Sequence, residues 1–225
     1  MGEHVLDLDA IESSLRTVQR NFSEINRVIN TPRDTLDDQV ITNMMAGYRY
    51  VDALTADGVD LFAIGASKHF LELNALVLCG TDPLERIRED AHLKATAQRF
   101  YEEDRGTISD LAAWYALHRD ETAWTRAAGL YVRLLSEPQL FIEGNHRTGA
   151  LIMSCILVRE GRPPFVLSID NAQGYFDPST LITKTKKTPI GMLFRIPKLK
   201  KEFASFLREN ADDRYLLHRA VTPAA

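Results

Sequence analysis

The chain has 225 residues, of which 45% are hydrophobic, which is enough apolar material for one substantial core but too little for three ordinary domains. Its formal net charge is −4 and its basic and acidic residues are interleaved, so general nucleic-acid binding is not expected. Cys79 and Cys155 lie in apolar stretches without CxxC spacing, which argues against a disulfide framework or a zinc site.

The N-terminal residues have neither the basic start nor the continuous apolar run of a signal peptide. No stretch of the sequence is long and apolar enough to span a bilayer. We therefore expect a cytoplasmic protein without a membrane partner.

The first 40 residues predict one long helix and the start of a second. Apolar residues recur at alternating steps of three and four from Leu8 to Ile29, which places them on one stripe of a single helix. That stripe would pack against neighbouring helices of the chain or against the partner in a homodimer. Asn30 ends this helix, and Thr31 with Pro32 is the expected cap and first position of the next.

Pairs of a glycine and a polar residue mark the ends of the helices that follow. The predicted helices span about 67 to 79, 82 to 103, 108 to 118 and 121 to 136, and a fifth begins after Gly144. The last two are the most apolar and are expected at the centre.

The C-terminal part predicts one extended run and two short helices. Phe165-Val166-Leu167 has extended character, and residues 178 to 186 and 198 to 210 are expected to be helical. The fold class that follows is all-α, with at most one small β-hairpin flap. We expect N-terminal helices in residues 1–80 that pack on or extend a core of residues 81–215, and a flexible tail at 216–225.

Polar residues are concentrated between the two central helices. Gly144 permits backbone angles that let successive amides face one concavity at a helix start, where the helix dipole favours an anion. Asn145 and Arg147 add donors, and Glu143 offers a carboxylate to a magnesium ion that bridges phosphates. These residues predict a phosphate site, and the alternative is a capped helix with an exposed Arg–Glu pair.

The same segment resembles the signature of the Fic/Doc (Fido) family, His-x-Phe-x-Asp/Glu-Gly-Asn-x-Arg-x-x-Arg. Five positions match it, namely Phe141, Glu143, Gly144, Asn145 and Arg147. The resemblance covers roughly residues 105 to 180. It implies a Fic-type helical bundle with its motif loop at residues 139–150. For most members it also implies AMPylation, which is transfer of the AMP part of ATP to a hydroxyl group of a target protein.

The resemblance also implies roles for single residues. Glu143 would hold Mg²⁺, while Gly144 and Asn145, at the bend before Thr148, would cradle the phosphates of ATP or another nucleotide. Arg147 would clamp the outer phosphate oxygens. Tyr175 falls where the family places a wall of the adenine pocket.

Three departures from the signature change the expected chemistry. Gln139 stands in place of the histidine base, and a missing general base typically lowers a rate by about 10² to 10⁴. Ala150 replaces the second arginine, and His146 replaces a small glycine, as in Doc-like members that phosphorylate their target. His146 sits at a helix start that keeps it neutral, so it is a candidate substitute base as well as a phosphate contact.

Ser205 to Asn210 resembles the inhibitory helix of the family, whose glutamate pairs with the arginine that is Ala150 here. Two functions therefore stay open. One is a divergent nucleotidyltransferase or phosphotransferase that modifies a target protein. The other is a pseudo-enzyme that uses the loop to bind a phosphate-bearing ligand or a partner protein.

Overall fold

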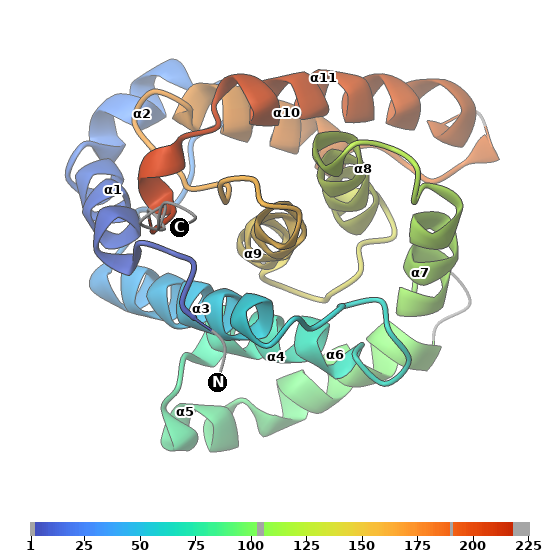
Figure 1. Ribbon diagram of the computed structural model, residues 1–225, viewed down its shortest axis with the longest axis horizontal. Helices are drawn as coiled ribbons and strands as arrows, with labels where there is room; N and C mark the ends of the chain where they lie inside the picture. The colour runs from blue at the N-terminus through green and yellow to red at the C-terminus, as the bar shows by residue number, and fades with distance from the viewer. Residues whose placement is uncertain (1–2, 103–105, 190, 218–225) are drawn as a thin grey trace, which may run out of the picture.

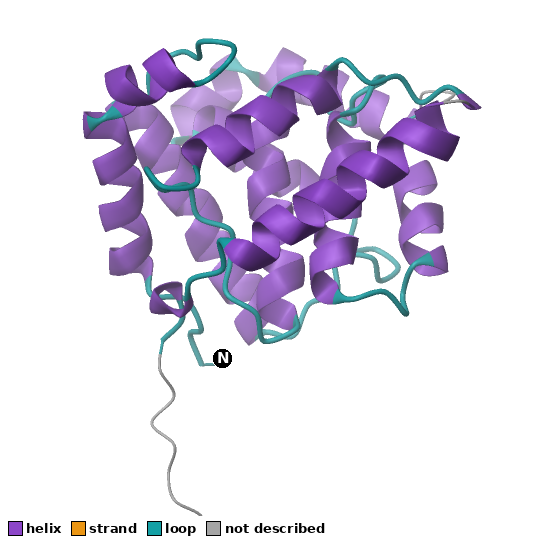
Figure 2. Cartoon of the chain, turned by 90° about the horizontal axis from the view of Figure 1, so that it is seen from above, coloured by secondary structure: helices purple, strands orange, loops and turns teal. Residues whose placement is uncertain are grey.

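The computed structural model describes residues 3–102, 106–189 and 191–217, and its helices account for most of them (Figures 1 and 2). The elements are α1 (Leu8–Arg20), α2 (Phe22–Val28), α3 (Asp38–Ala56), α4 (Lys68–Cys79), α5 (Pro83–Arg88), α6 (Asp90–Glu102), α7 (Ile108–Leu117), α8 (Ala123–Leu135), α9 (Asn145–Arg159), α10 (Ala172–Thr183), the π-helical turn η1 (Gly191–Arg195), α11 (Ile196–Glu209) and the 3-10 turn η2 (Asp213–Tyr215). The all-α prediction is confirmed. Within the described residues, β-pairing is limited to two isolated bridges, Leu6 with Leu216 and Glu137 with Lys186.

Helix α9 runs through the centre of the molecule, where Figure 1 shows it end-on inside a ring of α3, α4, α8 and the C-terminal helices. Every residue of α9 from Thr148 to Val158 is buried. Helix α8 approaches it closely at Gly149, where a Cβ atom would lie 2.8 Å from the Tyr131 ring. The prediction that these two helices form the centre is therefore correct, and the motif loop is anchored at both ends in the core.

The predicted long N-terminal helix is in fact two helices. Helix α1 ends at Arg20, and Asn21 turns its side-chain amide back to the Thr17 carbonyl at 2.8 Å. The apolar stripe stays buried across the break, and on α2 Phe22 meets the ring of Phe176 from α10 edge-on at 6.2 Å. A straight helix could not follow the curved surface of the core, so the break bends the stripe towards α10.

The second helix begins at Asp38 rather than after Thr31 and Pro32, which lie in the connecting segment. Asp37 is its cap and accepts from the Val40 amide at 2.7 Å. The predicted cap is wrong because Asn26 binds both backbone groups of Arg33, at 2.8 and 2.9 Å, and holds that segment in a loop.

Two further helix predictions have wrong boundaries. The span 82 to 103 is divided at Glu89 into α5 and α6, and residues 103–105 lie outside the described chain. The helix predicted from residue 178 begins at Ala172 and contains Pro178 in its interior. Its start is decided by Asn171, whose side chain binds the Val166 carbonyl at 2.9 Å before the helix begins.

The extended run Phe165-Val166-Leu167 forms no strand within the described residues. Its backbone carbonyls are satisfied by side chains instead. The Phe165 carbonyl accepts from the Tyr48 hydroxyl at 2.7 Å, and the Leu167 carbonyl accepts from the Ser14 hydroxyl at 2.9 Å.

One hydrophobic cluster contains residues from Leu6 to Tyr215, so residues 1–80 and 81–215 share a core. The segment predicted as a tail begins with Leu216, which pairs with Leu6, while residues 218–225 lie outside the described chain. In the part of the chain that the structure describes, no helix is both long and apolar enough to cross a membrane.

Candidate functional site

The connection from α8 to α9 turns into the helix at Gly144. Its φ is +72°, in the left-handed region that glycine adopts without strain. A Cβ atom here would also lie 3.0 Å from the Asn74 side-chain nitrogen and 3.3 Å from Leu78. Both the backbone angle and the close approach to α4 therefore require a glycine at this position.

Asn145 holds the loop together from inside. Its Oδ1 accepts from the Phe141 amide at 3.0 Å, and its Nδ2 donates to the Phe141 carbonyl at 2.9 Å and to Gln139 Oε1 at 3.1 Å. A backbone N–H can only donate, so the first bond determines which way the Asn145 amide faces. Gln139 must then direct its oxygen to Asn145, which leaves its Nε2 group as the donor available to a ligand.

Asn74 on α4 clamps the same loop from outside, and sequence analysis missed it. Its Nδ2 donates to the Glu143 carbonyl at 2.9 Å and to Thr148 Oγ1 at 3.0 Å. Thr148 is fully buried, so its hydroxyl serves this internal contact. An asparagine among the leucines, alanine and valine of α4 was the available signal, because a buried amide needs partners.

The unpaired backbone amides at the start of α9 are suited to binding an anion. The amide of Thr148 donates to the Gly144 carbonyl at 2.9 Å, whereas the amides of residues 142–147 have no acceptor in the described part of the protein. Unpaired amides at a helix start, together with the helix dipole, favour an oxyanion.

Arg147 is half-buried next to these amides. Its Nη1 donates to the Val77 carbonyl at 3.3 Å, near the C-terminal end of α4, where a cation is favourable. Burial lowers the pKa of the guanidinium, and the Glu143 and Asp37 carboxylates oppose that shift. Arg147 therefore braces α4 and keeps further donors for a ligand.

Glu143 is exposed, and within the described residues no group of three acidic, histidine or cysteine side chains could hold a metal ion. One carboxylate nevertheless fits magnesium that is bound mainly by water and by the phosphates of a ligand.

His146 faces the interior. Its Nδ1 lies 3.2 Å from the Tyr131 hydroxyl, and its carbonyl accepts from the Tyr175 hydroxyl at 3.0 Å. Burial, together with the nearby charge of Arg33, lowers the pKa of His146 to about 4, so the ring is neutral at physiological pH. Tyr175 is itself buried and stacks on Phe165 at 4.8 Å.

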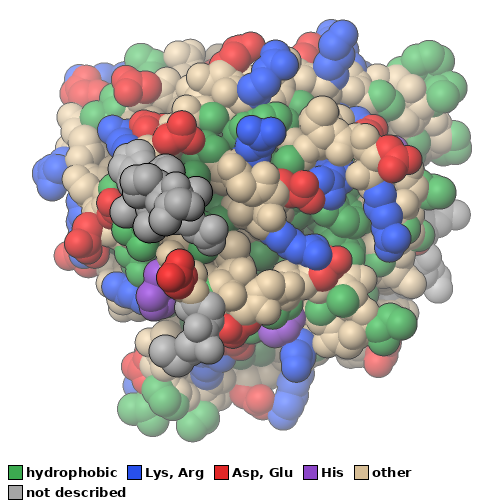
Figure 3. Space-filling model, in the orientation of Figure 1, with side chains coloured by type: hydrophobic (Ala, Val, Ile, Leu, Met, Phe, Trp, Pro, Cys, Tyr) green, Lys and Arg blue, Asp and Glu red, His purple; other side chains and the backbone are tan. Residues whose placement is uncertain are grey.

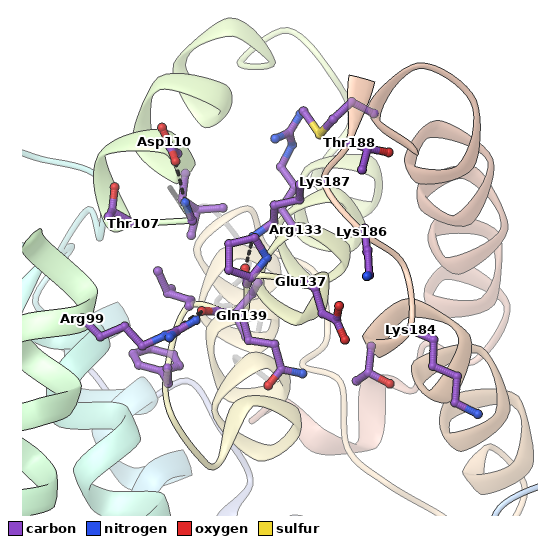
Figure 4. A pocket seen from close by; sticks show the side chains of 18 of the residues that line it. Arg99, Thr107, Asp110, Arg133, Glu137, Gln139, Lys184, Lys186, Lys187 and Thr188 are labelled. Atoms are coloured by element: carbon purple, nitrogen blue, oxygen red, sulfur yellow. Dashed lines mark hydrogen bonds between the residues drawn. The ribbon is translucent and has the colours of Figure 1, made fainter. Parts of the chain in front are cut away.

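A cavity of about 1250 Å³ opens beside the first part of the loop (Figure 4). Gln139 to Ile142 form one side, the start of α7 forms another, and the segment after α10 forms a third. Its charged lining comprises Arg99, Asp110, Arg133, Glu137, Lys184, Lys186 and Lys187. On the face shown in Figure 3, by contrast, basic and acidic side chains are mixed.

The structure brings only some of the predicted site residues to this cavity. Gln139 lines it directly and Asn145 binds Gln139. Among the described residues, Gly144 to Thr148 and Tyr175 do not line the cavity. Ser205 and Glu209 of the segment that resembles an inhibitory helix line a different hollow with Lys198 and Lys201 on α11.

Arg99 and Arg133 at the cavity were also missed, because they come from separate parts of the chain. Arg99 donates twice to the Gln139 carbonyl, at 3.1 and 2.9 Å, and so positions the backbone of Gln139.

No protein-family model matches the sequence, and no curated protein sequence matches it. Among solved structures, the chain is similar to Fic-1 from C. elegans, with 18% identity and a TM-score of 0.43. A single-substitution variant of Fic-1 gives 17% identity and a TM-score of 0.46. The matches cover 89% and 90% of this chain, which spans 59% of the length of those structures. These scores are too low to assign a family.

Proposed function

We propose that this chain is a Fic-like protein that binds a nucleotide or another phosphate-bearing ligand at the loop 139–148, and that it acts as a binding module rather than a base-dependent transferase. The observation that carries this proposal is the hydrogen-bond chain from the Phe141 amide through Asn145 to Gln139 Oε1. It leaves a donor at the position where a transferase of this type needs a base.

The loop supplies the hydrogen-bond donors that a phosphate oxyanion requires. Unpaired amides at the start of α9, the remaining donors of Arg147 and the Nε2 group of Gln139 can all donate to phosphate oxygens. Mg²⁺, where it accompanies the phosphates, would be held by Glu143 and would neutralise part of their charge. The Gln139 amide cannot accept a proton from an attacking hydroxyl group near neutral pH.

A divergent transferase that modifies a target protein is the second candidate. The retained spacing of Glu143, Asn145 and Arg147 favours it, because phosphoryl-type transfer depends heavily on positioning and charge stabilisation.

Arg147→Ala is expected to weaken binding of magnesium and ATP by about 10-fold or more, since a hydrogen bond to a charged group contributes about 1.5–3 kcal/mol. Calorimetric titration measures this directly. Arg159→Ala is the matched control, because Arg159 lies on the same helix, is partly exposed and pairs with Asp60 at 2.8 Å. If Arg147→Ala folds and binds as tightly as the parent protein, the loop is not the phosphate site.

Incubation with labelled ATP, magnesium and a cell lysate separates the two candidates. We expect no labelled protein with the parent chain, because Gln139 presents a donor. Label that appears only with Gln139→His would show that the nucleotide is held in a reactive orientation and that the base alone is missing. Transfer by the parent chain that disappears in Arg147→Ala would replace the binding proposal with the transferase.

A further inference from the structure

The cavity beside Gln139 contains cations that the loop does not use. Arg133 reaches it from the last turn of α8, and Lys187 reaches it from the segment after α10 (Figure 4). That segment is fastened to the loop, because the Glu137 amide donates to the Thr185 carbonyl at 2.9 Å and the Lys187 amide donates to the Glu137 carbonyl at 2.8 Å. The two cations are therefore held at defined places on the lining.

Within the described residues, few negatively charged groups neutralise these two cations. The Lys187 ammonium donates to the Pro138 carbonyl at 2.5 Å, which is a neutral acceptor. The Arg133 guanidinium lies over the Trp114 ring at 5.1 Å, and its Nε is buried without an acceptor in the described residues. The Asp110 carboxylate opposes the charge of both cations, and one of its oxygens accepts from the Gly106 amide at 2.7 Å. Glu137 is the second carboxylate among the described residues of the lining.

Desolvated cations close to one another raise the free energy of the empty cavity, and an anion that enters lowers it. Burial, together with the Arg133 and Arg99 charges and against the opposing charge of Asp110, lowers the pKa of Lys187 to about 8. A dianion suits this cluster better than a monoanion, because two cations line the same cavity and each lowers its free energy by meeting negative charge. A guanidinium fork beside an ammonium is also a frequent combination for phosphate oxygens.

We propose that Arg133 and Lys187 form a second oxyanion subsite, separate from the amides of α9, which takes a phosphate dianion such as the terminal group of a phosphomonoester. Within the described residues, Arg133 and Lys187 make no hydrogen bond or ion pair with Arg147 or Glu143, and of these four only Arg133 and Lys187 lie on the cavity lining, so the two anion sites share no cation. A ligand with two phosphate groups could occupy both places.

The subsite has a characteristic pH dependence. A phosphate group gains its second charge near pH 6 to 7, so affinity should rise up to about pH 7.5. Above about pH 8 the free Lys187 loses its proton and affinity should fall. Lys187→Arg keeps a positive charge throughout this range, so it should abolish the fall at high pH.

The test is an NMR-detected titration with inorganic phosphate at pH 7.5 and pH 9.5. We expect the parent protein to bind about 10-fold more weakly at the higher pH, whereas Lys187→Arg should bind similarly at both. Lys187→Met and Arg133→Met should each weaken binding at pH 7.5 by about 10-fold or more. Lys94→Met is the matched control, because Lys94 is exposed, pairs with Asp90 on α6 at 2.7 Å and does not line the cavity.

Arg147→Ala separates this proposal from the one for the loop. Phosphate binding at the cavity should persist within about 2-fold in this variant, because Arg147 is not part of the lining. If Arg147→Ala removes all phosphate binding while Arg133→Met leaves it intact, or if the parent protein shows no binding, the subsite does not exist. If Arg133→Met melts at a markedly lower temperature, Arg133→Gln, which removes the charge but keeps polar groups over Trp114, takes its place with the same expected loss of binding.

Discussion

Asn145→Ala should lower the free energy of unfolding by about 2–4 kcal/mol, because it leaves the buried amide and carbonyl of Phe141 without partners, and each such orphan costs about 1–3 kcal/mol. Asn145 is 5% exposed, so water does not replace its side chain without rearrangement of the loop. Urea unfolding followed by circular dichroism measures the change.

Asn145→Asp tests which of the Asn145 hydrogen bonds matter, because it keeps an acceptor but removes the donor. The carboxylate keeps an acceptor for the Phe141 amide but turns an oxygen towards the Phe141 carbonyl and Gln139 Oε1, which are also acceptors. We expect this variant to be at least as unstable as Asn145→Ala. Asn210→Ala is the control, since Asn210 makes a comparable bond to the Phe206 carbonyl at 2.9 Å on the partly exposed end of α11. Stability of Asn145→Ala close to that of the Asn210 variant would show that Asn145 does not organise the loop.

Phe141→Ala should lower the free energy of unfolding by about 3–5 kcal/mol, as large-to-small changes of buried aromatic residues do. Phe141 is 1% exposed and stacks on Phe100 of α6 with ring centroids 5.8 Å apart. The loss combines the transfer of the ring out of the core with the cavity left between the loop and α6. Chemical denaturation and the melting temperature both report it.

Phe194→Ala provides the comparison for this change. Phe194 lies on η1 and is 65% exposed, so its truncation should alter stability by no more than about 0.5 kcal/mol. Phe141→Leu refills much of the volume of the lost ring, so its loss of unfolding free energy should lie between those of Phe141→Ala and Phe194→Ala. A Phe141→Ala protein as stable as the Phe194 variant would mean that the loop is not anchored in the core as described.

Helices whose ends are marked by adjacent residues were predictable from the sequence. Helix α4 was expected at 67 to 79 and is found at Lys68–Cys79, and α7 was expected at 108 to 118 and is found at Ile108–Leu117. Gly80 follows α4 and Gly106 precedes α7, and both have positive φ, so a neighbouring glycine marks one end of each helix. The sharp turn at Gly144 followed from the sequence for the same reason, because only the local backbone is involved.

Contacts between distant segments decided the rest. Asn21 breaks the first helix so that α2 can reach α10, and Asn26 keeps Arg33 in a loop where a helix start was predicted. Neither outcome is visible in the spacing of apolar residues, since the same stripe fits a straight helix and a broken one. Only the shape of the assembled core distinguishes them.

Local patterns predicted the helical class, the central pair of helices and the loop of polar residues between them, because periodicity, capping and glycine geometry act over a few residues. Other features became visible only in the folded chain. Asn145 orients the Gln139 amide so that its Nε2 group is free to donate, Asn74 binds the loop from α4, and Arg133 and Lys187 line one cavity. Those outcomes depend on burial and on hydrogen bonds between segments up to about 70 residues apart, which no local pattern records.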